Sequence, residues 1–168
     1  MNETQRWYAL HTKARHEFIA SGELREKGIE TFLPSIKRIS QWKDRKKVVA
    51  FPLFPGYLFV HISLRSDEFL TALRARGVVT FISLEKGIPT PLAAEEISSL
   101  RGMIESGQDI DIYPQLREGT RVRVRKGPLV GAVGTLVRKE DNYVFAVNIE
   151  ILGRSVGVKI YPDDLEEA

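Results

Sequence analysis

Residues 51–60, FPLFPGYLFV, join two β-rich stretches through the corner Phe54-Pro55-Gly56. The flanking runs, KKVVAFPLF and GYLFVHISL, are rich in β-branched and aromatic residues, which favour strands. A proline followed by a glycine is typical of a tight turn, because proline restricts φ and glycine accepts a positive φ. The segment therefore predicts two strands joined by a tight turn.

The same ten residues also concentrate aromatic side chains at that turn, and two interpretations are open. A core strand with a tight entry turn accounts for Leu58 and Val60, which share one face of a strand. Phe54, Pro55 and Tyr57 are harder to bury together, because a strand alternates its faces and a turn lies at the surface. A docking pocket for another protein is the alternative, since rigid aromatic side chains supply contact area at low entropic cost.

Strand-like and helix-like patterns alternate along the first 106 residues. RWYALHT at residues 6–12 alternates as a strand does, and Gly28 follows a helix-like stretch at the position of a C-cap. Ser66 is a suitable N-cap for a second helix, and an amphipathic third helix is expected before Ser106. The order β-α-β-β-β-α-β-α predicts an antiparallel sheet flanked by helices, an α+β fold. The expected helices cover residues 14–27, 66–75 and 93–106, and the expected strands cover residues 6–12, 29–39 with a break at Pro34, 46–54, 56–64 and 78–84.

The composition changes after Ser106. Residues 107–116 contain glycine, proline and scattered acids without a clear period, which predicts a linker. Four or five short strands follow, in TRVRV, AVGTLVR, NYVFAVNIE and RSVGVKI. They indicate a small all-β barrel over residues 117–168, and its glycines and valines oppose any conversion to helix.

The bulk composition excludes several classes of protein. The 168 residues include no cysteine, so disulfides and thiolate metal sites are excluded. No apolar run approaches the roughly 20 residues that span a bilayer, and the N-terminus does not have the pattern of a secretory signal. We therefore expect a cytoplasmic protein.

The net charge of +3 is mild but unevenly distributed. The segment from Lys37 to Lys47 holds six basic residues and one acid, whereas the stretch from Pro162 onward is acidic. The basic segment either faces nucleic acid or forms a solvated hairpin, and both readings stay open.

No arrangement of residues typical of catalysis is present. The three histidines, His11, His16 and His61, are dispersed and do not have the spacing of a zinc site. Phosphate-binding loops, dinucleotide fingerprints and nucleophile elbows are absent from the sequence. We expect no catalytic residues, no metal and no cofactor, and thus a binding protein rather than an enzyme.

Ordered motifs along nearly the whole chain resemble the NusG family of transcription factors. RWYALHTKARHE, FPLFPGYLFV and RARGVVTFI are similar to its N-terminal domain, and GTRVRVRKGPLVGAVGTLVR and EILGRSVGVKI resemble its KOW domain. The resemblance implies a NusG N-terminal domain over residues 1–106, a linker over 107–116 and an SH3-like KOW barrel over 117–168. PLFPGYLFV is closest to the specialised RfaH-like paralogues, which include the antiterminators of polysaccharide operons.

The resemblance implies partners and binding residues. The N-terminal domain would bind the clamp helices of the RNA polymerase β′ subunit through Tyr8, His11, Phe54, Pro55, Tyr57 and Phe59. Lys13, His16 and Arg76 match positions that contact the non-template DNA strand, and Arg15 and Arg74 add charge to that patch. Leu152, beside Arg154, matches the barrel tip that binds ribosomal protein S10 or Rho.

The implied function is that of a monomeric elongation factor that promotes processive elongation or antitermination. Two alternatives stay open. One is a housekeeping NusG-type factor that couples transcription to Rho or to the ribosome. The other is a ribosome-associated RNA-binding KOW protein.

Overall fold

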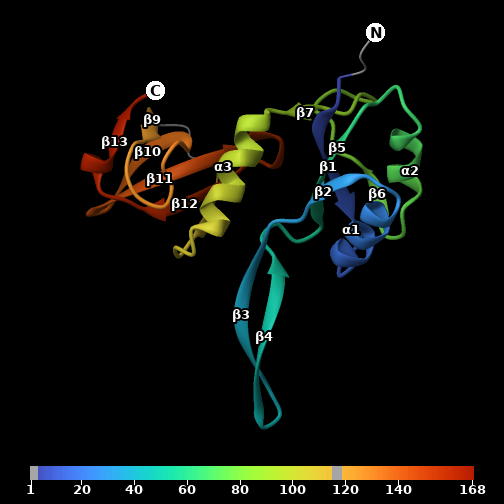
Figure 1. Ribbon diagram of the computed structural model, residues 1–168, viewed down its shortest axis with the longest axis horizontal. Coiled ribbons are helices and arrows are strands. Elements are labelled where there is room, and N and C mark those ends of the chain that lie inside the picture. The colour runs from blue at the N-terminus through green and yellow to red at the C-terminus, as the bar shows by residue number, and fades with distance from the viewer. Residues whose placement is uncertain (1–3, 115–118) are drawn as a thin grey trace. The chain divides into compact units, whose positions relative to one another are not determined.

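A computed structural model describes residues 4–114 and 119–168 (Figure 1). The chain divides into two compact units, Met1–Pro91 and Leu92–Ala168, with the short strand β7 (Pro91–Leu92) at the division. Each unit is built on its own antiparallel sheet. The expectation of an α+β fold with an antiparallel sheet flanked by helices is confirmed.

The first unit is a sheet in which β2, β5, β1 and β6 lie side by side in that order. The strands β5 and β1 form its centre and pair in the register Tyr8↔Val60 and Leu10↔Leu58. The unit's strands are β1 (Arg6–Thr12), β2 (Glu30–Phe32), β5 (Tyr57–Ile62) and β6 (Val78–Phe81), and its helices are α1 (Glu17–Glu26) and α2 (Glu68–Arg74).

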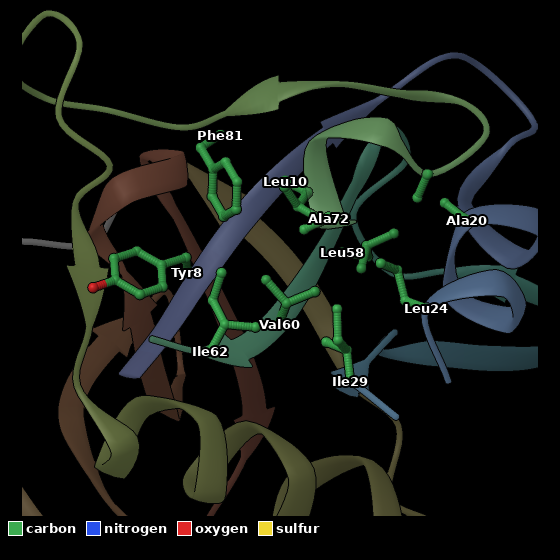
Figure 2. Close-up of a cluster of buried hydrophobic side chains, with 11 residues drawn as sticks. Tyr8, Leu10, Ala20, Leu24, Ile29, Leu58, Val60, Ile62, Ala72 and Phe81 are labelled. Atoms are coloured by element: carbon green, nitrogen blue, oxygen red, sulfur yellow. The ribbon is translucent and has the colours of Figure 1, made fainter. Parts of the chain in front are cut away.

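The core of this unit lies between one face of the sheet and its two helices (Figure 2). Alternate residues of β1 and β5, such as Leu10 and Val60, meet Leu24 from α1 and Ala72 from α2. The Ser66 hydroxyl oxygen accepts a hydrogen bond from the Glu68 amide at 3.2 Å, which satisfies a free N–H at the start of α2. The remaining members of the cluster are Tyr8, Ala20, Ile29, Leu58, Ile62, Ala75 and Phe81.

A separate two-stranded sheet extends from this unit (Figure 1). Its strands, β3 (Ser35–Trp42) and β4 (Arg45–Pro52), pair with each other over their full length. The expected strand over residues 29–39 is therefore divided at Pro34 into β2 and β3, which belong to different sheets. At the base of the hairpin, the Leu53 amide donates a hydrogen bond to the Pro34 carbonyl oxygen at 2.7 Å.

The second unit is a six-stranded antiparallel sheet in the order β13-β9-β10-β11-β12-β8. Its core contains Val124, Phe145, Ile149 and Val156, all essentially buried. The unit's elements are α3 (Ala94–Glu105), β8 (Asp111–Pro114), β9 (Thr120–Val124), β10 (Val133–Lys139), β11 (Asn142–Ile149), the 3-10 turn η1 (Glu150–Leu152), β12 (Arg154–Lys159), the 3-10 turn η2 (Pro162–Asp164) and β13 (Leu165–Glu167).

The third helix was expected to close the first unit, but it lies in the second. Helix α3 packs against β10 and β11. The Val133 amide donates to the Ser99 hydroxyl oxygen at 3.4 Å, and Arg121 forms an ion pair with Glu95 at 2.7 Å. The compact units thus divide after Pro91, whereas the domain boundary inferred from the sequence lies at residue 106. That assignment, 1–106, 107–116 and 117–168, stays a prediction.

Part of the expected linker forms a strand. Residues 111–114 form β8, which pairs with β12 in the register Val156↔Ile112 and Ser155↔Tyr113. Residues 115 and 116 of that linker lie outside the described residues. Pairing with an existing edge strand supplies the backbone hydrogen bonds that the sequence pattern alone did not indicate.

None of the helices in residues 4–114 and 119–168 is long and apolar enough to cross a membrane. Within the same residues, no group of three histidine or acidic side chains is arranged to hold a metal ion.

Candidate functional site

The face of the first sheet opposite the helix-covered core carries a row of aromatic side chains. Directly paired residues of an antiparallel ladder share a face, so Ala9↔Phe59 and His11↔Tyr57 lie on the face opposite Tyr8↔Val60. We call this row the aromatic face. It consists of Trp7, His11, Phe32, Phe54, Tyr57, Phe59 and His61.

The rings of the aromatic face contact one another in pairs. Trp7 stacks on His61 with ring centroids 4.9 Å apart, and His11 lies tilted against Tyr57 at 5.5 Å. Phe54 meets Phe59 edge-on at 6.4 Å. Offset and edge-to-face contacts of this kind hold each ring in a defined orientation. The aromatic face is therefore a set of rings in mutual contact rather than a set of independent side chains.

The residues that were expected to bind polymerase fall into a buried group and an accessible group. The side chains of Phe54 and Phe59 are only 1% and 0% exposed. His11 and Tyr57 are half-buried, and Pro55 is exposed. An open pocket lined by all of these rings is therefore not present in this structure. Phe54 and Phe59 support the surface, and His11, Pro55 and Tyr57 are the accessible part of it.

Tyr8 does not belong with the other five. It lies on the opposite face of β1, within the core cluster beneath α1 and α2, and its ring meets that of Phe81 edge-on at 6.1 Å (Figure 2). Burial raises the pKa of the Tyr8 hydroxyl, and the nearby Arg6 charge partly opposes this rise. The expectation that Tyr8 lines the same surface as Tyr57 is corrected by strand alternation, which directs even-numbered residues of β1 into the core.

The turn at the edge of the aromatic face is held by a buried acid. Glu17, 5% exposed at the start of α1, accepts a hydrogen bond from the Gly56 amide at 3.1 Å. The Gly56 carbonyl oxygen accepts one from the Thr12 amide at 2.8 Å. Gly56 has a φ of 87°, a conformation that glycine adopts without steric cost. The sequence reasoning missed Glu17, because nothing in its local pattern distinguishes it from an ordinary acid in a first helical turn.

The five residues expected to contact DNA come from two segments that the fold brings together. The Lys13 amide donates a hydrogen bond to the Gly77 carbonyl oxygen at 2.8 Å. A Cβ added to Gly77 would lie 2.4 Å from the His16 Cβ, so this glycine allows the two segments to touch. We call this cluster the basic rim. It consists of Lys13, Arg15, His16, Arg74 and Arg76, all exposed except for the half-buried His16.

The two residues expected at the barrel tip, Leu152 and Arg154, are half-buried. Leu152 ends η1 and is half-buried. Gly153 follows with a φ of 63°, and Arg154, also half-buried, begins β12 opposite Ile149. The two residues thus lie at a tight turn between β11 and β12, and Leu152 presents only part of its side chain.

Comparison with known proteins decides the family. A family model described as "Transcription termination factor nusG" matches residues 5–101, more than half of the chain. The chain belongs to the NusG family. This membership confirms the resemblance inferred from the motifs.

Relatives of known name agree with this assignment over the whole chain. The "Transcription termination/antitermination protein NusG" of Staphylococcus aureus strains Mu50 and N315 is 30% identical, over 97% of this chain and 96% of the relative. A solved structure titled "Domain interaction in Thermotoga maritima NusG" covers 98% of this chain and 97% of its own, with a TM-score of 0.51 and 18% identity. That likeness supports the NusG fold.

Membership in the NusG family places the chain among transcription termination/antitermination factors. These are transcription factors and not enzymes, which confirms the expectation of a non-enzymatic protein.

Proposed function

We propose that this NusG-family protein is an elongation factor that docks through its aromatic face on the clamp helices of the RNA polymerase β′ subunit. The observation that carries the proposal is the gathering of seven aromatic or imidazole rings on the sheet face opposite α1 and α2. Rings already fixed by their neighbours lose little entropy on binding, which makes them effective contact residues.

The residues of the docking surface have two roles. His11, Pro55 and Tyr57 are accessible and make the direct contacts. Phe54 and Phe59 are buried and pack edge-on against each other, and their proposed role is to support the surface. An aromatic side chain at the centre of an interface typically contributes about 2 kcal/mol or more to binding. Tyr57, which pairs with His11 across the sheet, is the candidate for that position.

We further propose that the basic rim binds the non-template DNA strand. Lysine and arginine on phosphates give binding that is sensitive to salt and weakly selective for sequence. His16 lies against Gly77, and the proposed role of its ring is to stack on an unpaired base. A factor held on both polymerase and DNA favours the closed clamp, because it binds that state more tightly than the open one.

We propose a specialised function, processive elongation or antitermination, and the support for it is that the motif PLFPGYLFV resembles the RfaH-like paralogues. The protein would act as a monomer in the cytoplasm. The half-buried Leu152 and Arg154 at the η1 turn are the proposed contact for ribosomal protein S10 or for Rho. The alternative is a housekeeping role that couples transcription to Rho or to the ribosome. In that case the contact made by the same turn would be the main function of the second unit.

A ribosome-associated RNA-binding role receives less support. Residues 117–168 hold nine basic and eight acidic residues, a balance that gives no net attraction for RNA. A gel shift of structured RNA with this fragment tests that alternative, which predicts a tight complex.

The docking proposal is tested by capture of the full-length protein on immobilised bacterial RNA polymerase. The variant His11→Ala/Tyr57→Ala removes two accessible rings. We expect its retention to fall at least tenfold while its circular dichroism spectrum stays that of the parent. Tyr161→Ala is the matched control, because Tyr161 is 80% exposed and lies in the other unit. Undiminished retention of the double variant would remove the docking assignment.

A further inference from the structure

The hairpin of β3 and β4 carries the whole positive excess of the chain. Residues 35–52 contain six basic residues and one acid, a net charge of +5, whereas the complete chain carries +3. The rest of the chain is therefore slightly acidic, at −2. A polyanion approaching this protein is attracted to the hairpin and to few other places.

The hairpin exposes large apolar side chains on a sheet of its own. Its strands form a two-stranded sheet of their own, and Figure 1 shows it extending away from β1 and β5. Ile39 and Val48 face each other across the ladder and are 72% and 64% exposed, and Trp42 next to the turn is 66% exposed. An isolated two-stranded ribbon is only marginally stable in water, so exposing large apolar groups on it is costly unless a partner covers them.

The register distributes the cations over both faces of the ribbon. Arg38, Trp42 and the residues paired with them, Val49 and Arg45, lie on one face together with Lys47, which pairs with Ser40. The opposite face carries Lys37, paired with Ala50, and Lys46, paired with Gln41. Lys43 lies in the turn. A β-ribbon that lies flat on a nucleic-acid strand needs cations on one face only, whereas this ribbon presents cations on both faces.

We propose that this hairpin inserts into the major groove of duplex DNA. Eight residues per strand give a ribbon about 26 Å long, and the major groove, about 12 Å wide, admits a two-stranded β-ribbon. A ribbon inside a groove has a phosphate wall beside each face, which matches cations on both faces. Double-stranded RNA does not fit, because its deep and narrow major groove excludes side chains.

The apolar residues have a place in the same arrangement. Ile39 and Val48 lie on the face that carries Lys37 and Lys46, so they point to the groove wall beside that face. Trp42, opposite Arg45 beside the turn, leads the ribbon into the groove. The phosphate contacts hold the protein without reading sequence, so the affinity of the hairpin is mainly electrostatic.

The test uses the full-length protein, without polymerase, and measures fluorescence anisotropy of a labelled 20-base-pair DNA duplex at several salt concentrations. One variant neutralises the first face (Arg38→Gln/Arg45→Gln/Lys47→Gln) and a second neutralises the other (Lys37→Gln/Lys46→Gln). Each lost phosphate contact lowers the slope of log affinity against log salt by about 0.9. We therefore expect slopes lower by about 2.7 and about 1.8. The matched control is Lys86→Gln/Lys126→Gln/Lys159→Gln, three exposed lysines outside the hairpin, and its slope should equal that of the parent.

Further nucleic-acid probes distinguish insertion into the DNA major groove from other modes of nucleic-acid binding. Both face variants should leave the affinity for single-stranded DNA of the same sequence unchanged, since the basic rim is the proposed site for that ligand. A duplex RNA of the same sequence should bind at least tenfold more weakly than the DNA. The inference would be overturned if only one of the two face variants lowered the slope, or if the face variants lost as much affinity for single-stranded DNA as for duplex DNA. It would also be overturned if the parent bound duplex RNA as tightly as duplex DNA, or if the control variant lowered the slope as much as the face variants. These outcomes do not depend on polymerase docking, which His11→Ala/Tyr57→Ala tests separately.

Discussion

The buried carboxylate of Glu17 accepts a hydrogen bond from the Gly56 amide at 3.1 Å, which joins the first turn of α1 to the turn that precedes β5. The two residues are 39 positions apart in the sequence. The Gly56 carbonyl oxygen also accepts a hydrogen bond from the Thr12 amide, so β1, α1 and the proline-glycine turn meet at one point. This point sets the edge of the aromatic face on one side and lies close to the start of the basic rim on the other.

Removing the Glu17 carboxylate should therefore loosen the turn. Hydrogen bonds to charged groups contribute about 1.5–3 kcal/mol, and Glu17→Ala also leaves the Gly56 amide without its acceptor. We expect a fall of that size in the free energy of unfolding, measured by urea denaturation. Glu17→Gln keeps a neutral acceptor and should lose less than half as much. Equal stabilities for Glu17→Ala and the parent would show that the hydrogen bond does not hold the turn.

Phe54 and Tyr57 should respond differently to truncation, although both lie on the aromatic face. Phe54 is 1% exposed and packs edge-on against Phe59, so Phe54→Ala should lower the free energy of unfolding by about 3–5 kcal/mol. Tyr57 is half-buried, and Tyr57→Ala should cost about 1 kcal/mol. Chemical denaturation of the two variants measures the difference. A Phe54→Ala protein as stable as Tyr57→Ala would contradict the supporting role of Phe54.

Gly77 should be essential to the assembly of the basic rim. Its φ is 88°, and an added Cβ would lie 2.4 Å from the His16 Cβ. We expect Gly77→Ala to destabilise the fold by about 1–3 kcal/mol and to weaken binding of single-stranded DNA. Gly22→Ala is the control, because Gly22 lies inside α1 with open space around its Cα, and this change should stabilise by about 0.5–1 kcal/mol. A Gly77→Ala variant that keeps both its stability and its DNA binding would contradict the role of Gly77 in the basic rim.

Glu96 should make the stability of the second unit depend on pH. Burial raises the pKa of its carboxyl to about 7, and the nearby Glu150 and Glu95 charges add to the rise. Because the folded pKa lies above the unfolded one, this group's contribution to stability is greatest below about pH 4.5 and is lost as the pH rises through about 7. Arg121, which pairs with Glu95, offsets part of the negative charge.

The variant Glu96→Gln carries no titrating carboxyl at this position. Its melting temperature should exceed that of the parent at pH 8 and approach it at pH 5, as measured by calorimetry at both values. Glu105→Gln, an exposed change on the same helix, is the control and should give no such difference between the two pH values. A constant offset between Glu96→Gln and the parent at both pH values would exclude titration of Glu96 as the cause.

Much of the local structure followed from residue patterns. The alternation of RWYALHT and the turn at Pro55-Gly56 were sufficient to predict β1, β5 and the turn that precedes β5. Ser66 was expected to be the N-cap of α2, whereas the N-cap is the next residue, Asp67, and the Ser66 hydroxyl oxygen instead accepts a hydrogen bond from the Glu68 amide. The strands β9 to β12 lie where short runs rich in valine predicted them. The strand and turn predictions held because they depend on contacts between residues that are near one another in the chain.

Predictions that depended on distant neighbours were less successful. The pattern of α3 correctly showed a helix with one apolar stripe, but an apolar stripe does not specify the sheet that it covers. The Tyr8 side chain was grouped with Tyr57 through resemblance, although the alternation of β1 places it on the core face. The strand β8 forms only because β12 offers it a partner.

The sequence by itself determined the family, the α+β class, the positions of the proline-glycine turn and the basic segment, and which residues alternate on each strand. These properties are encoded in local spacing, composition and motif order. Only the tertiary structure decided that Phe54 and Phe59 are covered while Tyr57 and Pro55 are accessible, and that Lys13 lies against Gly77. It also decided that both faces of the hairpin carry cations, since that depends on the register of β3 against β4. The physical reason is that burial and pairing are properties of segments packed together, whose mutual positions are fixed by the whole core rather than by any one stretch of residues.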